Sequence, residues 1–248
     1  MRKMRAKTNW LKACAASAAL LALLCVFVVA FPQPAFAYRI AYQNYEVWSD
    51  RPIPRAIEPV LDDVTRRWRT SPLYDRATPA QIFICNEPWR MWLYGMHFST
   101  QFGGVADVWL TRHVVIRAAD IEANRIVPPG PAPIADAAQR PLSYFIAHEL
   151  THSDVSRRFG RTMMLRYPEW LLEGYADYVG KAGDFDYAAN RAAFIAGAPA
   201  MDRRKSGLYR GYHLKVAYLL DQQGWPLERL FAQAPAEQEV ERWLRAGK

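Results

Sequence analysis

Hydrophobic positions between residues 38 and 117 follow the patterns of strands and of one amphipathic helix. Residues 39–48 (RIAYQNYEVW) have the aromatic and β-branched content of a strand, and residues 81–85 (QIFIC) predict a second, buried strand. Residues 108–117 (VWLTRHVVIR) predict one or two more. Residues 55–69 place apolar side chains at helical spacing with charge on the opposite face, which predicts a helix. These apolar positions are Ile57, Val60, Leu61, Val64 and Trp68.

From Pro141 onward the pattern becomes helical. A proline suits the first turn of a helix, so Pro141 and Pro168 predict two helix starts, with ends at Gly160 and Gly180. Further helices are expected over residues 209–222, 226–232 and 235–245. Strands come first and helices follow, an order typical of the α+β class. We expect a small N-terminal mixed sheet followed by a helical half, with a proline-rich loop over residues 127–133 before it.

The first 37 residues differ from the rest of the chain. They contain five basic residues and no acidic one, an apolar run over residues 13–31, and the small-x-small sequence Ala35-Phe36-Ala37. This pattern is typical of a secretory signal peptide cleaved after Ala37, and an uncleaved anchor is the alternative. We therefore expect residues 38–248 to be one exported domain, periplasmic or extracellular. If the N-terminal segment is not cleaved, it would instead anchor the domain in the inner membrane, with the domain facing outward.

Charge and cysteine content restrict the function further. The formal net charge of +8 falls to +3 when the five basic residues of the N-terminal segment are removed. The remaining chain has no block of lysine and arginine, so we expect no nucleic-acid partner. Cys85 is the one cysteine after residue 37, which excludes an internal disulfide in the exported domain. We expect it to be a small buried residue at a strand end.

One pattern carries chemistry. His148-Glu149-Leu150-Thr151-His152 lies within the helix predicted after Pro141, so its two histidines are one turn apart on one face. Two imidazoles in this arrangement can bind one zinc ion, and a third ligand is then needed. Glu173, near the start of the next helix, is the candidate. Gly174 beside it lets two helices approach closely, and Asp177 shares its face, where it could accept the ring N–H of a ligating histidine. His97 and His113 have no companion at ligand spacing, and we expect ordinary loop or sheet positions for them.

These residues resemble a known family. His148-Glu149-x-x-His152 followed by Glu173, with the wording PEWLLEGYADY around that glutamate, is similar to the gluzincin zinc metallopeptidases of the thermolysin-like superfamily, in particular to small bacterial members. The resemblance covers residues 141–181. It implies a zincin-like fold, Zn²⁺ bound by the two histidines and Glu173, Glu149 as the general base, and Asp177 as the hydrogen-bond partner of His148.

The resemblance also implies the reaction and its substrate. Glu149 would take a proton from a zinc-activated water that hydrolyses a bond in a peptide or protein, and a further donor would stabilise the oxyanion. Tyr209, Tyr212, His213 and Tyr167 are candidates for this donor, and Tyr212 is preferred. By analogy with the fold, the strand around residues 104–109 would bind substrate backbone, and Gly103-Gly104 mark a close backbone approach. The alternative function is a non-catalytic, zinc-containing binding or scaffold protein of the cell envelope. The sequence leaves cleavage specificity and oligomeric state open.

Overall fold

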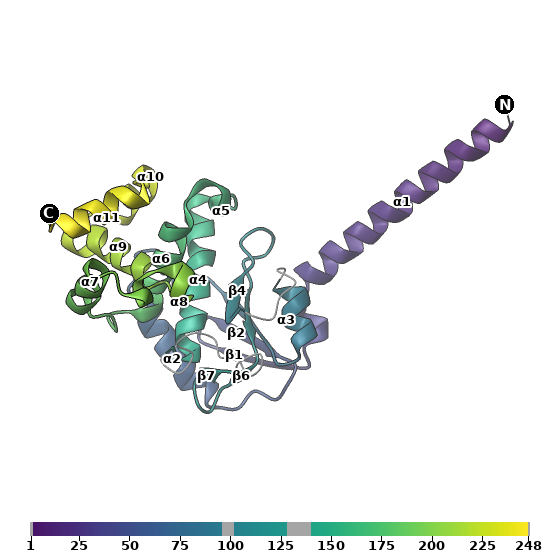
Figure 1. Cartoon of the computed structure of the whole chain (residues 1–248). Coiled ribbons are helices and arrows are strands. Elements are labelled where there is room, and N and C mark those ends of the chain that lie inside the picture. Colours follow the sequence, from purple (N-terminus) through teal and green to yellow (C-terminus); the bar gives the residue numbers. More distant parts are fainter. Residues whose placement is uncertain (1, 96–101, 128–139, 248) are drawn as a thin grey trace.

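The computed structural model describes residues 2–95, 102–127 and 140–247, and it combines a small sheet with a helical half (Figure 1). A long helix, α1 (Arg2–Ala30), precedes both. The sheet-bearing half contains β1 (Tyr38–Tyr42), β2 (Tyr45–Ser49), α2 (Ile57–Trp68), β3 (Ala80–Cys85), α3 (Pro88–Tyr94), β4 (Gly104–Ala106), β5 (Val114–Arg117), β6 (Ala119–Asp120) and β7 (Arg125–Ile126). The helical half contains α4 (Leu142–Phe159), α5 (Met163–Arg166), α6 (Glu169–Lys181), α7 (Tyr187–Ile195), α8 (Arg203–Ser206), α9 (Arg210–Ala217), α10 (Leu227–Gln233) and α11 (Glu237–Ala246). The predicted α+β class is confirmed.

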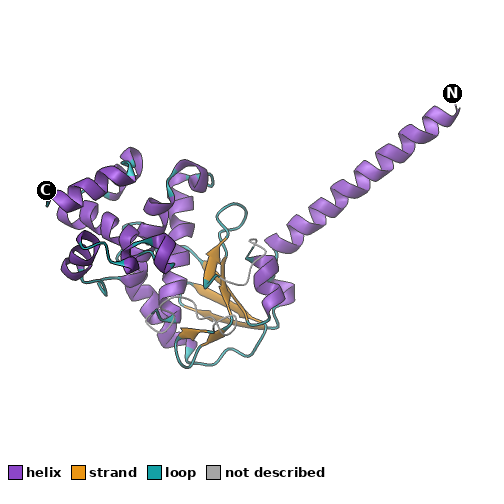
Figure 2. Ribbon diagram, viewed as in Figure 1, coloured by secondary structure: helices purple, strands orange, loops and turns teal. Residues whose placement is uncertain are grey.

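The sheet is mixed, and its strand order is β1-β2-β3-β5-β4. Strand β1 pairs antiparallel with β2, whereas β2, β3 and β5 run parallel to one another. Strand β4 pairs antiparallel with β5 at the end of the sheet, so among the described residues one side of its backbone has no neighbouring strand (Figure 2). This free side is available to other groups because a strand at a sheet edge leaves half of its N–H and C=O groups unpaired.

Alternating residues of β3 separate two cores. Ile82 and Ile84 belong to the main core, which lies between the sheet and helices α2 and α4. Phe83 and Cys85 point to the other face, where α3 supplies Met91 to a second, smaller cluster. Successive side chains of a strand point to opposite faces, so one central strand contributes to both cores. Cys85 is buried at the end of β3, as predicted.

Helix α4 is enclosed by its neighbours. Every residue from Leu142 to Ser156 is buried, and the helix packs against α2, α6 and strands β4 and β5. Its polar side chains therefore need partners inside the protein. Ser156 donates to the carbonyl of Val108, and Asp154 accepts a hydrogen bond from the indole of Trp68. The helix is thus held by hydrogen bonds from the sheet-bearing half and by packing against α6 of the helical half.

Glycines of α6 set how closely its neighbours pack. A Cβ at Gly174 would lie 2.7 Å from the backbone oxygen of Tyr212 in α9, and a Cβ at Gly180 would lie 3.0 Å from the ring of Tyr144 in α4. The close approach predicted at Gly174 therefore exists, but it joins α6 to α9 rather than to the histidine-bearing helix. Helix α6 lies between α4 and α9, in contact with both.

Several predicted boundaries were wrong. Residues 39–48 form a hairpin, not one strand, because the chain reverses at Gln43, whose φ is +52°. Of residues 108–117 only the end from Val114 is a strand, since Asp107 accepts hydrogen bonds from the amides of residues 109, 110 and 111 and folds a turn. The helix expected over 209–222 is α-helical to Ala217 and continues as a π-helical turn. The predicted proline-rich loop lies largely outside the described residues.

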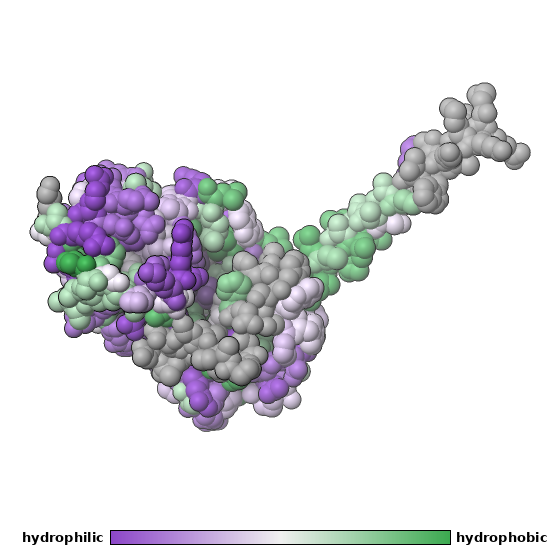
Figure 3. Space-filling view, viewed as in Figure 1, coloured by the Kyte–Doolittle hydropathy of each residue, from purple (hydrophilic) through white to green (hydrophobic). Residues whose placement is uncertain are grey.

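Helix α1 projects away from the rest of the chain, and its described surface is mainly apolar (Figures 1 and 3). The exposed side chains of its second half include Leu20, Leu23, Val26 and Phe27. Within the described ranges, no helix is long and apolar enough to cross a membrane.

The residues just after α1 are part of the folded domain. Phe36 is 4% exposed and packs against Phe83 and Tyr94, at ring centroid distances of 5.2 and 5.5 Å. Arg90 donates a hydrogen bond to the carbonyl of Ala35. The packed domain therefore begins before the boundary predicted after Ala37, and cleavage at that boundary would remove Phe36 from the smaller core.

Phe36→Ala should destabilise the domain by about 3 kcal/mol, because it removes a buried aromatic ring and leaves a cavity beside Phe83. Urea denaturation of a chain that begins at Ala30 measures the effect. The matched control is Phe31→Ala, since Phe31 is 54% exposed and should change the free energy of unfolding by less than about 0.5 kcal/mol. Equal urea midpoints for the two variants would contradict this packing.

Candidate metal centre

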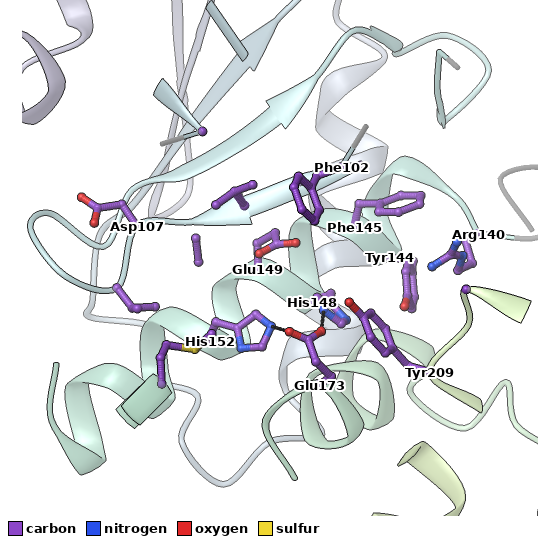
Figure 4. A pocket seen from close by; sticks show the side chains of 18 of the residues that line it. Phe102, Asp107, Arg140, Tyr144, Phe145, His148, Glu149, His152, Glu173 and Tyr209 are labelled. Carbon is purple, nitrogen blue, oxygen red and sulfur yellow. Dashed lines mark hydrogen bonds and ion pairs between the residues drawn. The ribbon is translucent and has the colours of Figure 1, made fainter. Parts of the chain in front are cut away.

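Helix α4 presents the two histidines of the predicted motif on one face. His148 and His152 are one turn apart, with ring centroids separated by 5.0 Å, and both are buried. Glu173 enters from the first half of α6 and faces them (Figure 4). Glu173 follows His152 by 21 residues in the sequence. The packing of α6 against α4 brings it to the two histidines.

The distances between the three side chains fit one metal ion. Nε2 of His148 lies 3.2 Å from Oε2 of Glu173, and Nε2 of His152 lies 3.6 Å from Oε1. One ligand atom from each residue can be chosen so that all three lie within 4.8 Å of one another. In a tetrahedral zinc site with bonds of 2.0–2.1 Å, neighbouring ligand atoms are about 3.3 Å apart. Two imidazoles and one carboxylate are also the donor set that zinc prefers, so the residues fit this ion.

The charges of the cluster favour a cation between its members. Burial opposes ionisation of Glu173, but the two histidines overcome it and hold the pKa of that carboxyl far below its usual range. Burial likewise lowers the pKa of His152, whereas the adjacent Glu173 carboxylate raises it overall. The Glu173 carboxylate thus favours positive charge beside it, and a divalent ion would compete with protons for the same ligand atoms.

Glu149 lies beside the cluster, beneath the edge strand. A Cβ at Gly104 would be 2.8 Å from Cγ of Glu149, so the glycine permits strand and side chain to approach. The backbone amide of Ala106 donates a hydrogen bond to the Glu149 carboxylate. Burial raises the pKa of Glu149 despite the neighbouring histidines. The close backbone approach predicted at Gly103-Gly104 is confirmed, because a Cβ at Gly103 would likewise collide with the ring of Phe145.

The cluster opens into a cleft of about 520 Å³. One wall is β4 with the turn that follows it, and the base is α4. The opposite wall includes Tyr209, between α8 and α9. Aromatic rings line the cleft on both sides, from Phe102 and Trp109 to Tyr144 and Phe145. A site of this size has room for several residues of an extended chain.

The preferred candidate for the oxyanion donor, Tyr212, does not line the cleft. Its ring stacks on that of Tyr209, with centroids 6.2 Å apart, and lies 5.2 Å from Nζ of Lys215. Tyr209 instead stacks on His148, with ring centroids 5.7 Å apart, and its hydroxyl forms a hydrogen bond with Glu173. Tyr209 directly precedes α9, which begins at Arg210, whereas Tyr212 lies within the helix.

Asp177 does not contact His148 as predicted. Its carboxylate accepts hydrogen bonds from the hydroxyl of Tyr144 and from Nδ1 of His213, and it forms an ion pair with Lys181. These partners hold its pKa far below the usual range although burial opposes ionisation. Tyr144 occupies the position between Asp177 and His148, with its ring centroid 5.7 Å from that of His148. Asp177 therefore holds the Tyr144 side chain, and the Tyr144 ring packs on His148.

The two histidines of the cluster are oriented by packing. Within the described part of the chain, Nδ1 of His148 and Nδ1 of His152 are buried and have no hydrogen-bond partner. Zinc-binding histidines usually have such a partner, which orients the ring. Here the ring of His148 lies between Tyr144 and Tyr209 instead.

His213, His113 and Tyr167 do not line the cleft. His213 is buried against Phe185, burial lowers the pKa of its ring, and its Nδ1 donates a hydrogen bond to Asp177. His113 was expected in a sheet position, but it lies directly before β5, where it packs on Phe83. Tyr167 packs on Phe159. His97 lies outside the described residues. Comparison of the chain with protein-family models, with curated proteins and with solved structures yielded no match.

Zinc should bind at one ion per chain and stabilise the fold. After removal of bound metal with a chelator, added zinc at about 1,000 times the dissociation constant should raise the free energy of unfolding by about 4 kcal/mol, because the unfolded chain lacks the site. Metal analysis and thermal unfolding measure the two effects. His152→Ala should lose both, whereas the control His113→Ala should keep the stoichiometry. A full complement of zinc in His152→Ala would remove His152 from the ligand set.

Proposed function

We propose that this chain is an exported zinc-dependent metallopeptidase of the gluzincin type. The observation that carries the proposal is the convergence of His148, His152 and Glu173 at the base of a cleft, beside the buried carboxyl of Glu149. The export part of the proposal rests on the signal-like sequence of residues 1–37.

A zincin-like fold is part of the proposal. A mixed sheet with an antiparallel edge strand packs on α4, which carries the two histidines, and α6 brings the glutamate. This arrangement agrees with what the resemblance of residues 141–181 implies. It supports the family assignment by topology and by the spacing of the three ligand candidates.

Zinc held by the three side chains would supply Lewis-acid chemistry, lowering the pKa of water and polarising a carbonyl group. Glu149 handles the proton. Its carboxylate takes a proton from the water that attacks the peptide carbonyl, and it then delivers that proton to the leaving amine. Burial suits it to both steps, because a raised pKa brings a carboxyl group closer to neutral pH, where it can both accept and donate.

Tyr209 is the donor best placed to stabilise the oxyanion. Its ring stacks on His148 and its hydroxyl lies at Glu173, so it borders the reacting position from the wall opposite β4. Burial, together with the nearby carboxylates, raises the pKa of Tyr209, so the hydroxyl keeps its proton and can donate it to a developing negative charge.

The substrate we propose is a peptide in extended conformation. Strand β4 lines the cleft, and its free edge can pair with substrate backbone as an added strand. Main-chain pairing of this kind positions a peptide bond independently of side-chain identity. The side chains of the substrate would then contact the aromatic and charged residues that line the cleft.

Glu149→Gln tests the function most directly. The amide has the shape of the carboxylate but does not accept a proton, so cleavage of a diverse peptide library should fall by about 10³-fold or more while zinc stays at one per chain. The wild-type protein treated with a chelator should be equally inactive. Wild-type cleavage rates in the variant would reject Glu149 as the base. A zinc-loaded wild type that cleaves nothing would support the alternative, a non-catalytic zinc-containing scaffold protein.

Tyr209→Phe should lower kcat by about 10²-fold with a smaller change in KM, since the hydroxyl acts mainly on the transition state. Tyr212→Phe is the matched control: it removes the same group from the same segment, but outside the cleft, and should leave kcat within about twofold of wild type. The opposite ranking of the two variants would restore Tyr212 as the donor.

A further inference from the structure

The cleft is electrically asymmetric. At one end lies Asp107, whose carboxylate is occupied by hydrogen bonds from the turn that follows it. At the other end lies Arg140, on the far side of the ligand cluster from Asp107 (Figure 4). Arg203 also lines the cleft. A substrate in the cleft therefore meets two guanidinium groups and no available carboxylate apart from Glu149 and Glu173 among the described lining residues.

Both arginines are one aromatic ring away from His148. The guanidinium of Arg140 lies 5.4 Å from the ring centroid of Tyr144, and Tyr144 packs on His148. The guanidinium of Arg203 lies 4.8 Å from the ring centroid of Tyr209, which stacks on the same histidine. Stacking on a ring restricts a guanidinium to one plane and orients its N–H groups before a ligand arrives.

The two side chains come from separate elements, and the fold brings both of them to the lining of one cleft. Arg140 directly precedes α4 and is buried, and it donates a hydrogen bond to the Tyr144 hydroxyl. A guanidinium has five N–H donors, so this bond is compatible with binding a ligand as well.

Arg203 begins α8, between the cleft and solvent. Its Nε is buried and has no hydrogen-bond partner in the described ranges. The nearest carboxylate, that of Glu169, is 3.9 Å away and 61% exposed. An ion pair of this length and exposure stabilises the fold very little. The ion pair with Glu169 therefore contributes little, and the buried Nε of Arg203 remains to be satisfied by something in the cleft.

We propose that Arg140 and Arg203 form a carboxylate-binding subsite, so that the preferred substrates carry a carboxylate close to the scissile bond. At about 3.4 Å per residue in an extended chain, a group bound one ring beyond His148 lies about two or three residues from the reacting peptide bond. Arginine is suited to this task because its planar fork matches the two oxygens of a carboxylate. The carboxylate belongs either to an aspartate or glutamate side chain or to the free C-terminus of a short peptide. The inference rests on the proposed peptidase function.

The test uses matched fluorogenic peptides and the full chain loaded with zinc. One series places glutamate or glutamine at each of the three positions on either side of the cleaved bond, with an amidated end. A second series compares a free C-terminal carboxylate with the amide. The wild type should cleave the best carboxylate peptide with kcat/KM at least 10-fold above its neutral partner. The series with the larger ratio identifies which carboxylate is bound.

Arg203→Gln should reduce this preference to less than threefold by acting mainly on the carboxylate peptides. Arg203→Glu should shift the preference toward peptides with lysine at the same position. The control Arg204→Gln changes the next, exposed arginine of α8, which does not line the cleft, and should keep the wild-type ratio. Because Arg140 is buried, Arg140→Gln is informative only after its unfolding temperature has been shown to match the wild type.

A binding measurement separates this inference from the proposed function. In the Glu149→Gln background, fluorescence anisotropy should show at least 10-fold tighter binding of the carboxylate peptide than of its amide, and Arg203→Gln should abolish the difference. Equal binding and equal cleavage of charged and neutral peptides would overturn the inference and leave the peptidase function intact. If no peptide is cleaved but the binding difference is present, the peptidase function fails and the carboxylate subsite stands.

Discussion

The enclosure of α4 is the constraint on which the rest of the structure depends. This helix carries both histidines and Glu149, and it is buried from Leu142 to Ser156 between the sheet, α2 and α6. A helix buried on all sides has little freedom to rotate or shift, because each polar side chain must keep its internal partner. The burial of α4 therefore fixes the positions of the imidazole rings of His148 and His152, which are one turn apart.

Helix α6 depends on a second, electrostatic constraint. Asp177 is a buried carboxylate, and its partners come from three helices: Tyr144 of α4, Lys181 of α6 itself and His213 of α9. Removing one partner from such a network leaves a buried charge uncompensated, which is strongly destabilising. The network therefore specifies how α6 lies between α4 and α9, and with it where Glu173 meets the histidines. It also supports the ring of Tyr144 against His148.

The wall that faces β4 is assembled from parts distant in sequence. Tyr209 and Arg203 come from the α8–α9 region, whereas Arg140 and Tyr144 come from the start of α4. Each contributes an aromatic ring or a guanidinium around His148, and the ring contacts replace the hydrogen bond that usually orients a zinc-binding histidine. The same contacts that hold the imidazole in place thus build the subsite proposed for a substrate carboxylate.

Local patterns were sufficient to predict much of this protein. The strand-then-helix order, the helices after Pro141 and Pro168, and the convergence of His148, His152 and Glu173 follow from periodicity and spacing, because these operate within a few turns of chain. The hairpin at Gln43 was missed because the strand-like composition continues through the turn. Tertiary structure alone decided the partners of Asp177, the position of Tyr209 rather than Tyr212 in the cleft, the burial of Phe36 and the presence of Arg140 and Arg203 in the lining of the same cleft. Each of these depends on how separate elements pack, and one-dimensional spacing contains no information on that packing.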